Sequence, residues 1–274
     1  MAENLLKGKK GIIFGALNDQ SIAWKTAIQS YAQGADLVLT NAPVAMRMGE
    51  IHELAKHVGG APVVPADATS VEDLTNLFEQ AKEHFGGQVD FVLHSIGMSP
   101  NVRKGKHYTD INYNWLQTTL DVSAISLHKT LAVAKKLDAI SEWGSVVALT
   151  YIAAQRIFPD YGDMADAKSL LESITRSFGY HYGVAKKIRV NTVSQSPTVT
   201  TAGSGVKGFD EFISYSEAMS PLGNADAQSC AEYCITLFSD LTRYVTMQTL
   251  FHDGGFSNTG VSMEVISKFG PSEG

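Results

Sequence analysis

The segment YGDMADAK (161–168) places a tyrosine and a lysine seven positions apart, and these two residue types can do proton chemistry together. On a helix, seven residues advance by about 700°, roughly 20° short of two turns, so Tyr161 and Lys168 would share one face. An ammonium about 4 Å from a phenol is worth on the order of 4 kcal/mol at an effective dielectric near 20, before desolvation. We therefore predict that Lys168 lowers the pKa of Tyr161 and makes it a competent proton donor to a developing oxyanion.

A second phenol strengthens this interpretation. Tyr151 directly follows the apolar run GSVVALT (144–150) and precedes Tyr161 by ten residues. In α/β proteins, ligands bind at the carboxyl ends of the strands, where Tyr151 would lie. For an isolated pair, a half-buried tyrosine and a surface lysine on an amphipathic helix would be the simpler interpretation. With Tyr151 at the end of a strand, we expect Tyr151, Tyr161 and Lys168 to converge on one catalytic site.

The elements that must position these residues alternate along the whole chain. Apolar runs predict strands at 11–15, 36–40, 62–66, 90–95, 144–150, 188–194 and 247–253. Periodic segments predict helices near 21–33, 46–58, 71–85, 113–137, 161–184, 208–218 and 225–239. Continuous Val, Ile and Leu runs are typical of strands that are buried on both faces. The sequence therefore predicts an α/β, doubly wound (Rossmann) fold with a mostly seven-stranded parallel sheet and helices on both faces.

Composition indicates one globular domain. The 274 residues are 44% hydrophobic and 18% charged, and no Pro-rich linker or internal repeat divides them. We predict a single domain over 1–274, with a substrate-binding loop near 194–220 in the Gly-, Ser- and Thr-rich segment. The N-terminus has no signal-like apolar region and no run approaches eighteen apolar residues, so we expect a cytoplasmic protein that is not inserted in a membrane.

Charge and cysteine content remove other classes of function. The net charge of −6 gives no general attraction for nucleic acid. Cys230 and Cys234 are four positions apart, which predicts one packed helix face and makes a disulfide awkward. No further ligands lie close to them in sequence, so we predict no metal site.

The turn after the first strand is a candidate dinucleotide site. Gly15 closes the strand and Ser21 can cap the next helix, whose N-terminus would face a pyrophosphate. The usual three-glycine fingerprint is missing, and Lys25 lies where a further glycine could ease helix packing. A plain strand-to-helix turn with a serine cap is the competing interpretation.

The next strand ends suggest where adenine and nicotinamide would lie. Asp67 can accept a hydrogen bond from an adenine amino group beside Ala68, or it can simply cap the helix that follows. Gly97 would let the backbone approach a flat ligand, whereas His94 is more typical of a core residue. The second strand ends in LTNAP, with neither an acidic residue for the ribose hydroxyls nor an adjacent arginine for a 2′-phosphate. Because Arg47 lies five residues past Ala42 and need not face the ribose, NADH is favoured and NADPH is not excluded.

Taken together, several motifs resemble one family. They are Gly15 with Ser21-Ile22-Ala23, HSIG (94–97), the Tyr151/Tyr161/Lys168 set, SPT (196–198) and HDGGFS (252–257). Over roughly residues 5–257, the chain resembles the enoyl-acyl-carrier-protein reductase of the short-chain dehydrogenase/reductase superfamily. The seven-residue spacing from tyrosine to lysine is the most specific feature, because most of that superfamily uses four.

The resemblance implies a reaction and a set of roles. The expected activity is hydride transfer from NADH to the β-carbon of a trans-2-enoyl thioester carried by acyl carrier protein, in fatty acid elongation. Tyr161 would protonate the enolate oxygen, Lys168 would bind the nicotinamide ribose, and Tyr151 would line the nicotinamide. Cofactor-binding positions carried over from the family are Gly15, Ser21, Ile22, Asp67, Ala68, Ile96, Lys168, Thr198, Val199, Thr200, Thr201 and Ala202.

Substrate and partner contacts follow from the same comparison. Ser99 falls at a substrate-contacting position, and an apolar slot for the acyl chain is expected from Met164, Val206, Phe209 and Phe212, which could equally be core residues. Arg103, Lys104 and Lys106, with Lys207, are a candidate docking patch for the acidic carrier protein. Homotetramers are typical of the family, with helices 113–137 and 161–184 as possible interfaces.

The sequence leaves two other functions open. A related reductase acting on a ketone or a 3-oxoacyl thioester would use the same phenol to protonate an alkoxide. A regulatory protein that senses a nucleotide without catalysis would keep the fold alone. The tyrosine spacing disfavours the first alternative, and the complete set of phenols and lysine disfavours the second.

Overall fold

The computed structural model describes residues 4–47, 50–198 and 209–269, with the side chain of residue 209 left out. Its centre is a parallel sheet of six strands in the order β2-β1-β3-β4-β5-β6. The strands are β1 (Lys10–Phe14), β2 (Asp36–Thr40), β3 (Val89–His94), β4 (Ile140–Thr150), β5 (Arg189–Gln195) and β6 (Thr249–His252). The chain winds outward on one side of β1 and then returns to β3 on its other side. The predicted doubly wound fold is confirmed, and the β1–β3 boundary is its topological switch point.

The predicted count of seven strands is wrong for the described residues. The segment expected as a strand at 62–66 makes only one isolated parallel bridge, between Val63 and Leu39 of β2. Leu39 donates its backbone N–H to the Pro62 carbonyl and Val64 donates to the Leu39 carbonyl. Pro62 and Pro65 have no N–H to donate, so the ladder cannot extend through them.

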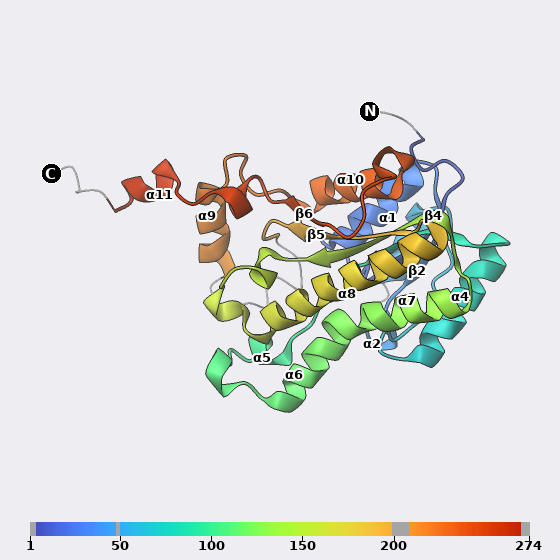
Figure 1. Cartoon of the computed structure of the whole chain (residues 1–274), viewed down its shortest axis with the longest axis horizontal. Coiled ribbons are helices and arrows are strands. Elements are labelled where there is room, and N and C mark those ends of the chain that lie inside the picture. The colour runs from blue at the N-terminus through green and yellow to red at the C-terminus, as the bar shows by residue number, and fades with distance from the viewer. Residues whose placement is uncertain (1–3, 48–49, 199–208, 270–274) are drawn as a thin grey trace.

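Helices cover both faces of the sheet, as Figure 1 shows. They are α1 (Ile22–Ala32), α2 (Pro43–Met46), α3 (Glu50–His57), α4 (Val71–Phe85), α5 (Pro100–Arg103), α6 (Tyr113–Leu120), α7 (Ser126–Lys136), α8 (Asp163–Lys186), α9 (Phe209–Met219), α10 (Ala227–Phe238) and α11 (Met263–Ser267). One apolar core joins the sheet to α4, α7 and α8. A second core joins the other face to α1, α3 and α10.

One predicted helix is interrupted by a turn of a different kind. The segment expected as one helix at 113–137 contains a π-helical turn, Asp121–Ile125, between α6 and α7. The Ser123 hydroxyl in this turn donates to the Met98 carbonyl at 3.0 Å and accepts from the Met98 N–H at 2.9 Å. The turn therefore fixes the loop that follows β3. Such turns often occur at functional sites.

Two further expectations concern packing and membranes. Cys230 and Cys234 are unpaired and fully buried on α10, which confirms the predicted packed helix face. Among the helices that the structure describes, none is both long and apolar enough to cross a bilayer.

Candidate active site

Gly15 lies where β1 and β3 come closest at their carboxyl ends. Its φ is +88°, and a Cβ built on it would lie 2.0 Å from the Ser95 carbonyl oxygen. No other residue type fits this backbone without a shift of the main chain. Ser21, six residues on, caps α1 as predicted, because its hydroxyl accepts from the Trp24 N–H at 3.2 Å. Ile22 is the first residue of α1 and is half-buried.

Lys168 lies in the second turn of α8 and is only 6% exposed. Its ammonium donates to the Leu149 carbonyl of β4 at 2.7 Å. Burial lowers its pKa to about 8, and the nearby Glu172 carboxylate acts in the opposite direction. A Cβ built on Gly97 would lie 2.8 Å from Met164 Cε and 3.6 Å from Lys168 Nζ. The bare backbone of Gly97 therefore lies against both of these side chains.

The two phenols converge, although not in the predicted way. Tyr151 directly follows β4, and its ring centroid lies 5.1 Å from that of Tyr161. Tyr161 does not lie on the helix of Lys168: it belongs to a 3₁₀ turn, Pro159–Tyr161, and α8 begins at Asp163. The prediction that Tyr161 and Lys168 share a helix face is wrong. Gly162, with φ 51° and ψ −138°, interrupts the helical path between them.

The predicted lowering of the Tyr161 pKa is also wrong in this structure. Burial raises the pKa of Tyr161, and burial is likewise the main cause of the raised pKa of Tyr151. Desolvation dominates because the two rings pack on each other and Phe158 packs on Tyr151, while the Lys168 ammonium is directed to a backbone carbonyl. Tyr161 therefore stays neutral near pH 7 and keeps the proton that a donor must carry. The Tyr151 hydroxyl oxygen is buried and makes no hydrogen bond with the described residues.

Aromatic side chains form an apolar wall beside Tyr151. Phe158 lies 5.4 Å from Tyr151 and 5.1 Å from Phe212, measured between ring centroids. Phe256 joins the cluster at 6.2 Å from Phe158. Phe212 of α9 was expected near the acyl chain, whereas Phe158 and Phe256 were not foreseen. Their proximity to Tyr151 and to HDGGFS in the sequence was the available signal.

Ser99 faces the protein interior. It is 4% exposed, its hydroxyl donates to Asp163 Oδ1 at 2.6 Å, and it accepts from the Val102 N–H at 3.0 Å. The hydroxyl is thus occupied by bonds within the protein, and a substrate contact at Ser99 stays a prediction. Asp163 was not anticipated. It heads a stripe of buried residues on α8 with Ala167 and Leu171, so a carboxylate in a core position was the overlooked signal.

At the predicted adenine-binding end of the cofactor site, the Asp67 side chain is polar and exposed. Its Oδ1 accepts from the N–H and hydroxyl of Thr69 at 2.8 and 2.7 Å. Ser70, not Asp67, caps α4, so the alternative role of Asp67 as a helix cap is wrong. Ala68 is buried and Ile96 packs against the core. The cofactor roles of Asp67, Ala68 and Ile96 stay predictions.

The threonine-rich segment is described only at its start. Thr198 donates its hydroxyl to the Ser196 carbonyl at 2.9 Å. Val199, Thr200, Thr201, Ala202, Val206 and Lys207 lie outside the described residues, and the Phe209 side chain is likewise not described.

His94 is a core residue, as expected. It is fully buried, and its Nε2 lies 2.9 Å from the Ser126 hydroxyl, which itself donates to the Val122 carbonyl at 2.7 Å. Ser126 therefore accepts the hydrogen from Nε2. Burial, together with the charge of Lys168, lowers the His94 pKa to about 3, so the ring is neutral.

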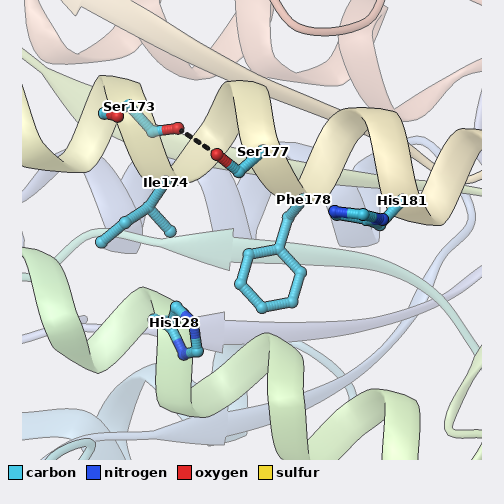
Figure 2. Close-up of a pocket in the computed structure, with 6 residues that line it drawn as sticks. All are labelled: His128, Ser173, Ile174, Ser177, Phe178 and His181. Carbon is cyan, nitrogen blue, oxygen red and sulfur yellow. Dashed lines mark hydrogen bonds between the residues drawn. The ribbon is translucent and has the colours of Figure 1, made fainter.

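A hollow of about 290 Å³ lies elsewhere, between α7 and α8, and is lined by His128, Ser173, Ile174, Ser177, Phe178 and His181. Figure 2 shows the Phe178 ring extending from α8 toward His128 of α7. Their ring centroids are 4.9 Å apart in an edge-on arrangement. Because these residues belong to the later turns of α8, the hollow is separate from Tyr161 and Lys168 at the start of that helix.

The fold and the site together define a class. A doubly wound parallel sheet with an obligatory glycine at its switch point, and with two phenols and a buried lysine beyond β4, is a Rossmann-type oxidoreductase. Residues 15–257 match a family described as Enoyl-(Acyl carrier protein) reductase. The chain belongs to the enoyl-acyl-carrier-protein reductase family. The two alternative functions considered from the sequence are thereby set aside.

Relatives match over nearly their whole length. The chain is 34% identical to enoyl-[acyl-carrier-protein] reductase [NADH] FabI of Rickettsia bellii, covering 95% of this chain and 98% of that protein. It is 64% identical to the FabI of Alistipes finegoldii in a crystal structure with NADH, with a TM-score of 0.94 over 95% of this chain and 92% of the other. The Aquifex aeolicus reductase is 29% identical, with a TM-score of 0.87 over 94% and 99% of the two chains.

Proposed function

We propose that Tyr161 is the proton donor and Lys168 the cofactor-orienting cation in the reaction of this family. The chain is an NADH-dependent enoyl-acyl-carrier-protein reductase of fatty acid synthesis. When bound, NADH supplies a hydride to the β-carbon of the enoyl thioester. The observation that carries the proposed roles is the convergence of Tyr151 and Tyr161 beyond β4, where Lys168 and Met164 meet the backbone of Gly97.

The residues present fit a dinucleotide. Gly15 has no side chain at the switch point, so the backbone at the ends of β1 and β3 is uncovered there. The capped N-terminus of α1 follows it. Gly97 presents a flat stretch of backbone beside a buried ammonium. The predicted cofactor residues at the adenine end, Asp67 and Ala68, lie after the bridge beside β2.

Each residue has a distinct task in the proton step. Reduction at the β-carbon leaves negative charge on the thioester oxygen, and the neutral Tyr161 hydroxyl donates its proton there. Lys168, with a pKa near 8, is mostly protonated at pH 7 and binds ribose hydroxyls. Tyr151 lines the nicotinamide side with a buried hydroxyl. The aromatic wall of Phe158, Phe212 and Phe256 excludes water around the acyl chain.

Replacing Tyr161 by Phe tests the donor. We expect kcat for a crotonyl thioester to fall by about 100-fold or more, since general acids contribute roughly 10²–10⁴. The dissociation constant for NADH, measured by fluorescence, should not change. Tyr215→Phe is the matched control, because Tyr215 lies in the same aromatic cluster at 6.3 Å from Phe256 but is 46% exposed. Full turnover by Tyr161→Phe would remove the proposed donor.

The carrier protein is proposed to dock on the basic patch formed by Arg103, Lys104 and Lys106. All three side chains are exposed and follow directly after the buried Ser99 and Asn101 at the site. Acidic helices would be attracted to this patch despite the net negative charge of the chain. Reversing the three charges should raise KM for enoyl-acyl carrier protein more than KM for a small enoyl thioester. An equal effect on both substrates would contradict docking here.

Assembly, location and domain extent are further parts of the proposal. A homotetramer is supported by helices α7 and α8, whose surfaces include the hollow where Ile174 and Phe178 lie among His128, Ser173, Ser177 and His181 (Figure 2). Light scattering of the purified protein tests the tetramer, and cell fractionation tests the expected cytoplasmic location. We also propose that residues 1–274 are one domain with a substrate-binding loop near 194–220.

A further inference from the structure

Asp163 is a buried carboxylate at the first turn of α8, two residues after Tyr161. It is fully buried and makes no ion pair with the residues that the structure describes. Its Oδ1 accepts from the Ser99 hydroxyl at 2.6 Å. Its Oδ2 accepts from Asn101 Nδ2 at 2.8 Å and lies 2.9 Å from the Thr119 hydroxyl.

These partners come from two separate segments. Ser99 and Asn101 lie in the loop and short helix that follow β3, immediately after Gly97, while Thr119 belongs to α6. Asn101 also exchanges two hydrogen bonds with the backbone of Asn112, the residue that caps α6. Asp163 therefore ties the start of α8 to the Gly97 loop and to α6 at one point.

The same loop is held from its other side. Ser123, in the π-helical turn, makes two hydrogen bonds with the backbone of Met98. Gly97 thus lies in a stretch whose next two residues are anchored, and Met164 of α8 packs against it. The loop at Gly97 is therefore held by Ser123 of the π-helical turn and by Asp163 at the start of α8.

Stability alone does not explain a carboxylate at this position. A buried charge pays a large desolvation cost, and apolar residues of similar volume are often at least as stabilising. Gly162, between Tyr161 and Asp163, has a positive φ and provides no side chain to fix the turn. Directional hydrogen bonds that the Asp163 carboxylate accepts can fix the backbone conformation of this turn, which Gly162 leaves free.

We propose that Asp163 is a positioning residue that sets the Tyr161 hydroxyl against the Gly97 loop during proton donation. This inference rests on the proposed role of Tyr161. Its expected consequence is that losing donors to Asp163 slows the proton step while NADH binding is kept.

Thr119→Val tests the inference with little change in shape. It removes one hydroxyl from Asp163, and we expect kcat for a crotonyl thioester to fall about five-fold, as for one lost hydrogen bond. The solvent deuterium isotope effect on kcat should increase, and the NADH dissociation constant should not change. Thr118→Val is the matched control. The Thr119 hydroxyl also lies 2.9 Å from the Trp115 carbonyl, four residues earlier on α6, and the Thr118 hydroxyl makes the equivalent bond to the Asn114 carbonyl at 3.0 Å but is exposed.

Two substitutions at Asp163 separate geometry from charge. Asp163→Ala should lower kcat by about 100-fold, the cost of a displacement near 1 Å. Asp163→Asn should stay within about three-fold of the unmodified protein, because its amide oxygen can accept from Asn101 and Thr119 while the Ser99 hydroxyl can accept from its amide nitrogen. If Asp163→Ala does not fold, Thr119→Val still decides.

A double-mutant comparison shows whether the effect passes through Tyr161. Adding Thr119→Val to Tyr161→Phe should cost no further activity, because the positioned hydroxyl is already gone. An unchanged kcat and isotope effect in Thr119→Val, or a full additional loss in the double variant, would overturn the inference. Failure of the proposed donor would show differently, as full turnover by Tyr161→Phe itself.

Discussion

Lys168→Met should separate the stability of the protein from its activity. Burial lowers the Lys168 pKa from 10.5 to about 8, so the folded protein holds this proton less tightly than the unfolded chain does. The difference corresponds to roughly 3 kcal/mol of destabilisation below pH 8, which is lost as pH rises from 8 to 10.5. Methionine has a similar length and no charge, so the variant lacks this pH dependence.

The expected result is a change in the stability difference between the two proteins. The free energy of unfolding of the unmodified protein, minus that of Lys168→Met, should rise by about 2 kcal/mol between pH 7 and pH 9.5. Tyrosine ionisation affects both proteins alike and cancels in this difference. The variant should also lose NADH-dependent turnover, because the ammonium beside Gly97 is gone.

Urea denaturation followed by tryptophan fluorescence at several pH values measures this difference. Replacing Lys168 removes a buried charge, which stabilises the variant. The variant also loses the Lys168–Leu149 hydrogen bond and leaves the Glu172 carboxylate without its cation, which lowers its free energy of unfolding by an amount that does not depend on pH in this range. The sign of the stability difference between the two proteins at pH 7 is therefore less informative than the change of that difference with pH. A difference that stays flat from pH 7 to 9.5 would refute the depressed pKa and the reasoning built on it.

Two further substitutions test the packing. Gly15→Ala places a Cβ 2.0 Å from a carbonyl oxygen and should destabilise by more than about 2 kcal/mol, whereas Gly60→Ala, with φ +77° and no atom within 4 Å, should cost only about 1 kcal/mol in chemical denaturation. Similar costs at both glycines would contradict the close approach of β1 and β3. Tyr182→Phe leaves the Leu131 carbonyl without its 2.6 Å buried donor and should lower the unfolding free energy by about 1–2 kcal/mol, while the exposed Tyr180→Phe should change it by less than about 0.5 kcal/mol. Equal effects of the two tyrosine substitutions would mean that the hydroxyl bond to Leu131 adds nothing.

Local sequence patterns were sufficient to predict the order of strands and helices and the residues at several of their ends. Runs such as GIIF and DLVLT are buried on both faces only in a parallel sheet, and their alternation with helices leads to the doubly wound order. Ser21 at a helix start and Gly15 at a strand end are read directly, because capping and positive φ restrict residue type. Tyr151 was also placed correctly, because the apolar run before it forms β4 and Tyr151 directly follows that strand.

Sequence patterns failed where a single residue or a distant partner decided the geometry. Helical periodicity continues through YGDMADAK, but Gly162 breaks the path and moves Tyr161 off the face of Lys168. Pro62 and Pro65 reduce a plausible strand to one bridge. The number of strands and the geometry of the pair were therefore both mispredicted.

The sequence by itself determined the fold class and the edge of the sheet beyond which Tyr151, Tyr161 and Lys168 lie, because these depend on local patterns and chain order. Only the tertiary structure decided the pKa values of the site residues and the hydrogen bonds that hold them in place. Burial raises the Tyr161 pKa instead of lowering it, and Asp163 finds partners 44 to 64 residues away. Desolvation and long-range hydrogen bonds depend on which segments meet in space, and a linear pattern does not specify that.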